Sequence, residues 1–170
     1  ERAMRDCRIN MILEGSSEIM KLFLAREAMD PHLQRAAPLL DKSTSIGKKI
    51  KLGLGLAGHY ALWFPKQWIH SFYGRSYSEL GILGKHFSFI EEISHKLAFK
   101  LFYYMMRYQQ KLEKKQMILG RLMEIGTDLF AMAATCSYAQ SLYAENPQDD
   151  SPIKLADHFC KLARRRINER

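Results

Sequence analysis

Apolar residues recur at steps of three and four along most of this 170-residue chain, which is the period that returns side chains to one face of an α-helix. The clearest runs predict helices over 78–110 and 111–145. No run alternates with the period of two that marks a half-buried strand. The predicted fold class is therefore all-α, an antiparallel helical bundle. The positions expected on the buried faces are Phe87, Ile90, Leu97, Leu101 and Met105 in the first helix and Leu122, Leu129, Met132 and Cys136 in the second.

Proline and small polar residues predict where the other helices begin and end. A helix is expected to start at Ser16 or Ser17 and to stop at Asp30-Pro31, because proline disfavours the helical conformation in the residue before it. A short helix over 32–40 should follow. Near the other end, the segment 146–152 contains two prolines and five polar residues and predicts a break before a closing helix over 153–168.

Residues 41–75 differ from the rest, because Gly47, Gly53, Gly55 and Gly58 each weaken a helix by roughly 1 kcal/mol relative to alanine. We expect a loosely helical or mobile segment that is too interrupted to span a bilayer. Lysines beside leucines and two tryptophans favour a helix lying in a membrane interface. A surface crossover whose aromatic residues pack on the bundle or on a partner subunit fits the same pattern, so both interpretations stay open.

The amino-acid composition indicates the class of protein but does not identify its function. The chain is 47% hydrophobic and 26% charged, as in an ordinary soluble globular protein, and is long enough for one domain with a core. Its net charge of +8 suggests an anionic partner or surface. Cys7, Cys136 and Cys160 lack CxxC spacing, which predicts free thiols and a reducing compartment. The chain opens at Glu1 without a secretory signal, so we expect a piece of something longer.

Glu14 stands between a run of aliphatic residues and Gly15-Ser16-Ser17, directly before the predicted helix. Glycine permits close approach of the backbone, serines are good N-caps, and a helix start offers unpaired N–H groups to an anion. A carboxylate in apolar surroundings is a candidate general base for carbon acids. On local sequence alone, an ordinary surface glutamate is the favoured interpretation.

The residues around Glu14 form a longer pattern: Arg5-Asp6-Cys7-Arg8-Ile9, then Ile12-Leu13-Glu14-Gly15-Ser16-Ser17-Glu18-Ile19, then Leu24-Ala25-Arg26-Glu27. This pattern closely resembles the C-terminal signature of the acyl-CoA dehydrogenase family. The segments 126–132 and 157–167 resemble the additional helical domain of its very-long-chain branch. Ser16 replaces the usual threonine of the signature and keeps its hydroxyl group.

The resemblance implies a role for each matching residue. Glu14 would be the catalytic base that removes the α-proton of an acyl-CoA, while its backbone N–H polarises the thioester carbonyl. Gly15 would contact the substrate, and Ser16, Ser17 and Glu18 would contact FAD. The intact enzyme would be an oxidoreductase of fatty acid β-oxidation that converts an acyl-CoA to a trans-2-enoyl-CoA.

The same resemblance implies the context of the chain. Residues 1–40 would end the catalytic helical domain, 41–75 would form the basic crossover, and 76–170 would form the C-terminal helical domain. The implied partners are the acyl-CoA substrate, an electron-transfer flavoprotein and a second subunit in a homodimer, with peripheral membrane contact through 44–72. The implied compartment is the bacterial cytoplasm or the mitochondrial matrix, and the chain alone is expected to be inactive because the other domains build the flavin pocket.

Competing interpretations rest on shorter patterns. A non-enzymatic helical module for dimerisation or membrane association is the main alternative. Glu92 and His95 form an ExxH, but a di-iron bundle needs a second ExxH, which the sequence lacks. The basic run 164–166 lacks the interleaved aromatic residues of a nucleic-acid interface, so a solvated helix end or a contact with a partner subunit is favoured. The aromatic and methionine residues between 99 and 106 are expected in the core.

Overall fold

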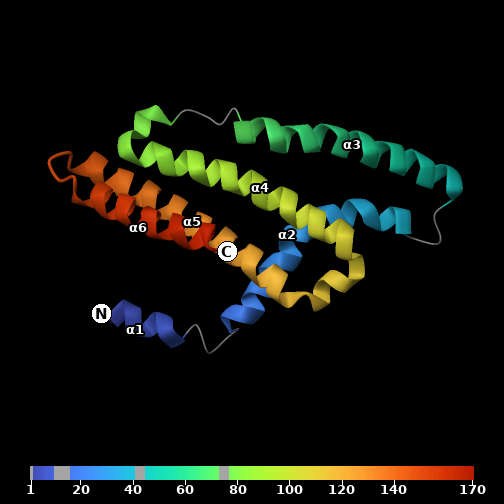
Figure 1. Ribbon diagram of the computed structural model, residues 1–170, viewed down its shortest axis with the longest axis horizontal. Coiled ribbons are helices and arrows are strands. Elements are labelled where there is room, and N and C mark those ends of the chain that lie inside the picture. Colours follow the sequence, from blue (N-terminus) through green and yellow to red (C-terminus); the bar gives the residue numbers. More distant parts are fainter. Residues whose placement is uncertain (1, 10–15, 41–44, 73–76) are drawn as a thin grey trace. The chain divides into compact units, whose positions relative to one another are not determined.

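The computed structural model describes residues 2–9, 16–40, 45–72 and 77–170. Throughout these ranges the regular structure is helical and no strand occurs, which confirms the all-α class. The helices are α1 (Arg2–Ile9), α2 (Ser17–Leu40), α3 (Ile46–Phe72), α4 (Gly84–Tyr108), α5 (Gln116–Glu145) and α6 (Ser151–Asn168), with 3-10 helices η1 (Ser78–Leu83) and η2 (Gln109–Lys114) (Figure 1).

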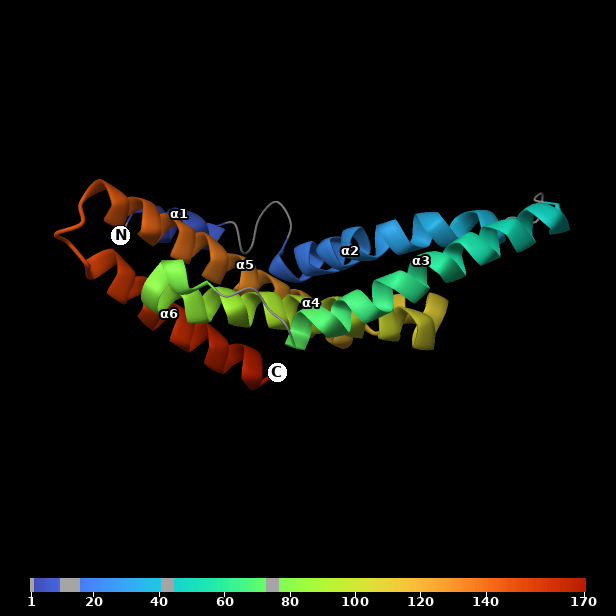
Figure 2. The ribbon, with the colours of Figure 1, turned by 90° about the horizontal axis from the view of Figure 1, so that it is seen from above.

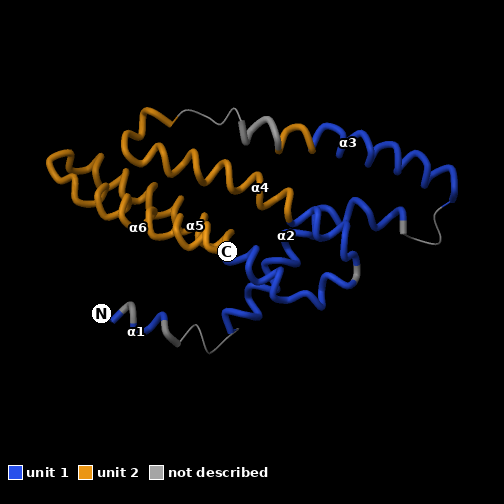
Figure 3. The backbone as a smooth tube through the Cα atoms, viewed as in Figure 1, with its two compact units in different colours: residues 1–63, 101–124 blue, residues 64–100, 125–170 orange. Residues whose placement is uncertain are grey.

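The chain divides into two compact units (Figure 3). One unit contains residues 1–63 and 101–124, and the other contains residues 64–100 and 125–170. The long helices α3, α4 and α5 each contribute residues to both units. The predicted division into 1–40, 41–75 and 76–170 stays a prediction.

The second unit, 64–100 with 125–170, is built on antiparallel packing of α5 and α6, which lie side by side in both views (Figures 1 and 2). Buried residues recur at steps of three and four on both helices, as helix packing requires. Most of the α6 positions are small, which lets the two helices approach closely. The core residues are Leu129, Met132, Cys136 and Ala139 on α5 and Ala156, Cys160, Ala163 and Ile167 on α6, with Leu83 and Phe89 packed against them.

Two glycines direct the chain from η1 into α4. Gly81 has a positive φ of 54°, a conformation that glycine adopts without steric cost. Gly84 lies so close to Tyr77 that an added Cβ would stand 2.1 Å from the Tyr77 carbonyl oxygen. Only glycine fits this approach, and the turn places Lys85 and His86 in the first turn of α4.

In the first unit, 1–63 with 101–124, an aromatic group joins α2, α3 and α4. The ring of His32 stacks on Tyr60 at a centroid distance of 5.8 Å, and both contact Phe102. His32 Nδ1 lies 2.8 Å from the Tyr60 hydroxyl group. Burial lowers the pKa of His32 and raises the pKa of Tyr60. Both shifts favour the neutral forms, so the contact joins an uncharged imidazole and an uncharged hydroxyl group, which avoids a partly buried charge.

The predicted stop at Asp30-Pro31 is wrong, because α2 continues through Pro31 and Pro38 to Leu40. A proline inside a helix removes one backbone hydrogen bond and costs about 3 kcal/mol. Pro31 has no N–H, so the Glu27 carbonyl oxygen loses its helical donor, and Glu27 is exposed, where solvent can hydrate this oxygen. In the next turn, Arg35 donates to the Pro31 carbonyl oxygen at 3.0 Å, and Gln34 donates to the Asp30 carboxylate.

The expectation for 41–75 was that glycines would loosen the helix. The structure contains a 27-residue helix, α3, which runs through all four glycines. A methyl group added at Gly47, Gly53, Gly55 or Gly58 would meet no atom within 4 Å. Among the helices that the structure describes, none is both long enough and apolar enough to cross a bilayer.

The expectation that the residues between 99 and 106 form core is wrong in part. Leu101 and Phe102 are buried, whereas Tyr103 is 43% exposed and Met106 is 60% exposed. A helix buries one face only, so neighbours along the sequence point to different surroundings.

Candidate functional site

The predicted catalytic motif lies partly outside the described residues. Glu14 and Gly15 are outside them, so their predicted roles stay predictions. Ser16 directly precedes α2, and its carbonyl oxygen accepts the backbone N–H of Met20 at 3.1 Å, so Ser16 occupies the N-cap position. Ser17 and Glu18 are exposed in the first turn of α2. The N–H groups of a first turn have no partner within the helix and suit a phosphate group, and the predicted contact of these residues with FAD stays a prediction.

The start of α2 also presents an apolar surface. Ile19 is 63% exposed and Phe23 is 53% exposed, with Met20 and Leu24 nearly as open. On the other side of the helix, Ala25 is fully buried and Lys21 forms an ion pair with Glu124 at 2.6 Å. The α2 helix is thus fixed on one face and open on an apolar face beside the predicted motif.

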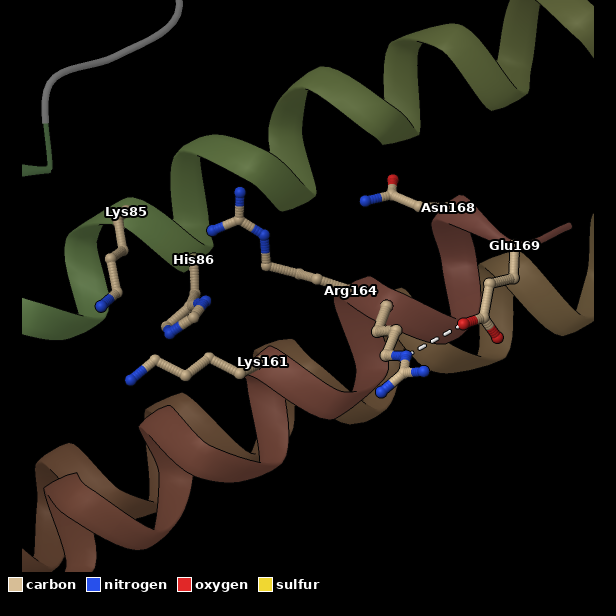
Figure 4. Close-up of a pocket in the computed structure, with 7 residues that line it drawn as sticks. Lys85, His86, Lys161, Arg164, Asn168 and Glu169 are labelled. Carbon is tan, nitrogen blue, oxygen red and sulfur yellow. Dashed lines mark hydrogen bonds and ion pairs between the residues drawn. The ribbon is translucent and has the colours of Figure 1, made fainter.

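A second site, not anticipated from the sequence, is a pocket of about 470 Å³ in the second unit. It lies between the start of α4, which supplies Lys85 and His86, and the C-terminal half of α6 (Figure 4). Nitrogen-bearing side chains dominate its lining. The remaining lining residues are Lys161, Arg164, Arg165 and Asn168 of α6 and Glu169, which directly follows this helix.

Asp157, which is not a lining residue itself, contacts three side chains that line this pocket. Its carboxylate accepts Lys161 Nζ at 2.6 Å, Lys85 Nζ at 2.9 Å and His86 Nε2 at 2.9 Å. The Lys161 and Lys85 ammonium groups hold the pKa of the Asp157 carboxyl well below its usual range. An ionised carboxylate only accepts hydrogen bonds, so His86 donates through Nε2–H.

His86 is completely buried, and its ring reaches from α4 into the space between the helices, beside Lys161 (Figure 4). Burial lowers the pKa of His86, and Lys85 and Arg164 lower it further, against the opposing effect of Asp157. The ring is therefore neutral near pH 7, with its proton on Nε2 and a lone pair on Nδ1. The buried Nδ1 has no hydrogen-bond partner. Such an atom costs about 1–3 kcal/mol when it stays unpaired, so a bound group that donates a hydrogen bond to Nδ1 would remove this cost.

The basic run at the end of α6 is distributed over three surroundings. Arg164 lies over the Phe89 ring at 4.4 Å, a cation–π contact. Arg165 pairs with Glu169 at 3.0 Å on the exposed side of α6. Arg166 pairs with Asp128 of α5 at 2.8 Å. The expected contact with acidic groups is therefore made within the chain for Arg166.

Sequence reasoning missed the pocket because its two halves are far apart along the chain. His86 and Asp157 are separated by 71 residues. A partial signal existed in α6, where Asp157, Lys161 and Arg165 recur at steps of four and so share one face. Nothing local indicated that α4 would face them.

The ExxH of α4 has structural partners. His95 Nδ1 lies 2.6 Å from Gln67 Oε1, and Glu92 forms an ion pair with Lys96. In the part of the chain that the structure describes, no group of three or more His, Cys, Asp or Glu residues could hold a metal ion.

The cysteines are free thiols, as predicted, but two of them meet. Cys136 Sγ and Cys160 Sγ lie 3.3 Å apart in the core between α5 and α6, whereas Cys7 is exposed. The hydrogen bond with Cys136 and burial raise the pKa of the Cys160 thiol. A buried thiol of this kind is unreactive as a nucleophile.

Comparison with known proteins shows which protein family the chain resembles. The family model described as "ACAD9/ACADV, C-terminal domain" matches residues 86–170. "Probable acyl-CoA dehydrogenase FadE10" of Mycobacterium tuberculosis is 42% identical over 173 residues, covering 98% of this chain and 26% of that protein. "Very long-chain specific acyl-CoA dehydrogenase, mitochondrial" of Rattus norvegicus is 29% identical over 175 residues, covering 99% of this chain and 26% of that protein. No solved structure matches the chain.

The chain spans about a quarter of the length of these relatives. All the residues that line the cationic pocket except Lys85 fall inside the matched domain. Half of the chain matches one family model, and the relatives named above align with nearly all of it. The protein therefore belongs to the acyl-CoA dehydrogenase family, in the branch defined by the ACAD9/ACADV C-terminal domain.

Proposed function

We propose that this chain is the C-terminal part of an FAD-dependent acyl-CoA dehydrogenase that converts a fatty acyl-CoA to the trans-2-enoyl-CoA. The observation that carries the proposal is the 42% identity to a probable acyl-CoA dehydrogenase over 98% of this chain. Since the chain spans 26% of that relative, the remaining parts of such an enzyme would supply most of the flavin and acyl-CoA pocket.

In this proposal Glu14 is the general base. Its carboxylate removes the α-proton of the acyl thioester, and its backbone N–H donates to the thioester carbonyl oxygen, where negative charge develops as the proton leaves. Gly15 lets the substrate approach the backbone. Bound FAD supplies an acceptor for the β-hydride. Ser16, Ser17 and Glu18 at the start of α2 orient that cofactor through first-turn N–H and side-chain groups.

The apolar face of α2 supports an assembly of this kind. Ile19, Met20, Phe23 and Leu24 are exposed beside the motif, and contiguous apolar surface of this sort usually becomes covered by another part of a protein. Burying it against the rest of the enzyme would fix the start of α2 beside the substrate. Catalysis by positioning depends on such fixation.

The test of the base is the Glu14→Gln variant of the intact protein that contains this chain. Glutamine keeps the size and the backbone N–H but cannot accept the proton, so we expect acyl-CoA turnover to fall by about 10³-fold while FAD content is unchanged. Glu27→Gln, which alters an exposed carboxylate of α2, is the matched control and should keep normal turnover. Normal α-proton abstraction by Glu14→Gln would refute the assignment.

The isolated 170-residue chain provides a second test, because it lacks most of the proposed pocket. We expect it to bind FAD weakly and to show no acyl-CoA turnover. Flavin absorbance after gel filtration and a dye-reduction assay measure both. Stoichiometric FAD together with turnover would contradict the proposal that the other parts of the enzyme are required.

The α3 helix favours a second role, in which the chain attaches the enzyme to a membrane surface. Ile46, Ile50 and Leu54 recur at steps of four and are 61–78% exposed, beside Lys48 and Lys51. Apolar residues flanked by lysines suit the surface of an anionic bilayer. We further expect the intact enzyme to be a homodimer that passes electrons to an electron-transfer flavoprotein.

Flotation with anionic liposomes tests this role. The double variant Ile50→Ser/Leu54→Ser should lose most of the liposome-bound fraction, whereas Leu155→Ser, which removes an equally exposed leucine on α6, should not. If the double variant instead weakens self-association in sedimentation and leaves flotation unchanged, α3 contacts a partner subunit and the membrane role is wrong.

A further inference from the structure

We propose that the pocket between α4 and α6 binds a phosphate group and shares a proton with it through His86 Nδ1. The pocket belongs to the second unit, and its residues lie outside the Glu14 motif. The proposal therefore does not depend on the dehydrogenase activity. It rests on the charges that line the pocket and on the buried, unpartnered nitrogen of His86.

The charge balance of the pocket is positive. Lys85, Lys161, Arg164 and Arg165 bring four cationic groups, against the carboxylates of Asp157 and Glu169. Each ammonium group carries three donors and each guanidinium group carries five, more than these two carboxylates can accept. Arginine and lysine donors converging on one space suit an oxyanion with several acceptor oxygens.

The lone pair of His86 restricts which kind of oxyanion can bind in the pocket. The His86 Nε2–H donates to Asp157, which leaves a lone pair on the buried Nδ1. The groups that face this ring are Lys85 on its own helix and Asp157, Lys161 and Arg164 on α6. A fully deprotonated anion would repel the lone pair, but an anion that carries an O–H can donate to it. The same hydrogen bond forms if the proton moves to Nδ1.

Phosphate fits this requirement because it keeps an ionisable proton near neutral pH, with a second pKa close to 6 in its monoesters. Sulfate carries no proton in this range. The pocket should therefore prefer phosphate to sulfate, although the two ions have similar size and shape. The volume of about 470 Å³ leaves room for the group to which the phosphate is attached.

Calorimetric titration of the protein at pH 6.0, where phosphate and its monoesters keep a proton and sulfate does not, tests the preference with inorganic phosphate and with sulfate. We expect saturable phosphate binding with a Kd of about 1 mM or tighter, and sulfate binding at least about tenfold weaker. Absence of saturable phosphate binding, or equal binding of both ions, would overturn the proposal.

Two variants test the residues. Lys161→Gln combined with Arg165→Gln changes two exposed side chains and should weaken phosphate binding about tenfold or more. Lys154→Gln, another exposed α6 lysine outside the pocket, should bind as the unchanged protein does. His86→Gln keeps an amide donor for Asp157 but removes Nδ1, so it should abolish the preference for phosphate over sulfate. Equal binding by the Lys161/Arg165 double variant would contradict the site even if His86→Gln fails to fold.

The source of the phosphate is settled by two further probes, glycerol 3-phosphate in solution and vesicles that contain phosphatidic acid. Competition by glycerol 3-phosphate with inorganic phosphate assigns a soluble phosphate monoester. Competition by the vesicles alone assigns a lipid headgroup. Failure of both probes to displace inorganic phosphate would overturn the assignment of a phosphate monoester.

Discussion

Asp157 connects two helices through one side chain, because its carboxylate receives hydrogen bonds from α4 and from its own helix, α6. Removing the charge would leave Lys85 and Lys161 without their counter-ion and weaken the only bond of the buried His86 ring. We expect Asp157→Asn to lower the free energy of unfolding by about 1–3 kcal/mol at pH 7, the range for charge-assisted hydrogen bonds. Urea unfolding of the two proteins measures this difference in the free energy of unfolding.

The pH dependence of this effect has a definite sign. The Asp157 pKa in the folded protein lies below its value of about 3.9 in the unfolded chain, so the contribution is complete above about pH 4 and is lost as the pH falls further. The difference between the protein and Asp157→Asn should narrow below that pH. Asp150→Asn, which removes an exposed ion pair on the same helix, should change stability by less than about 0.5 kcal/mol at any pH. If Asp150→Asn destabilised the protein as much as Asp157→Asn, the special role of the Asp157 carboxylate would be contradicted.

The cysteines give a second prediction for single residues. Cys136 and Cys160 are completely buried, and the pKa of Cys160 is raised, so neither should react with a thiol reagent in the folded protein. Cys7 is exposed and should react quickly. Ellman's reagent should thus detect one fast thiol under native conditions and all three after denaturation. Fast reaction of a Cys7→Ser variant would show that the core thiols are accessible.

At the scale of elements, glycines have opposite roles in α3 and at the start of α4. Gly53→Ala should stabilise the protein by about 0.5–1 kcal/mol, because an added methyl group meets no atom within 4 Å and alanine favours the helix. Gly84→Ala should destabilise it by more than about 2 kcal/mol, because its Cβ would lie 2.1 Å from the Tyr77 carbonyl oxygen. Thermal unfolding of the two variants, compared with each other, checks both signs. Similar shifts would show that helix propensity alone decides both sites.

The elements also show how far local pattern predicts structure. The break near Asn146-Pro147 and the closing helix were confirmed within a few residues, since proline and polar residues act through their own backbone. The stop at Pro31 was wrong, because the loss of one backbone hydrogen bond disfavours a helix without preventing it. The continuous α3 was missed for a related reason: a propensity cost of about 1 kcal/mol per glycine biases a helix without excluding it.

At the scale of the whole molecule, stability of the second unit depends on the seam between α5 and α6. Met132 is completely buried in this seam, whereas Phe130, two residues away, is 76% exposed. Met132→Ala should therefore lower the free energy of unfolding by about 2–5 kcal/mol, and Phe130→Ala by less than about 0.5 kcal/mol. Chemical denaturation measures both. A large loss in Phe130→Ala would mean that this face is covered, for example by a second copy of the chain.

The sequence by itself determined the helical class, the helix limits at Ser17, Glu145 and Asn168, and the membership of the acyl-CoA dehydrogenase family. These follow from period, turn residues and a continuous motif around Glu14, all of which are local along the chain. Only the tertiary structure decided that His86 meets Asp157 across 71 residues and that Cys136 meets Cys160. The physical reason is that a helical period specifies which residues share a face, whereas the choice of the facing helix depends on packing of the whole unit.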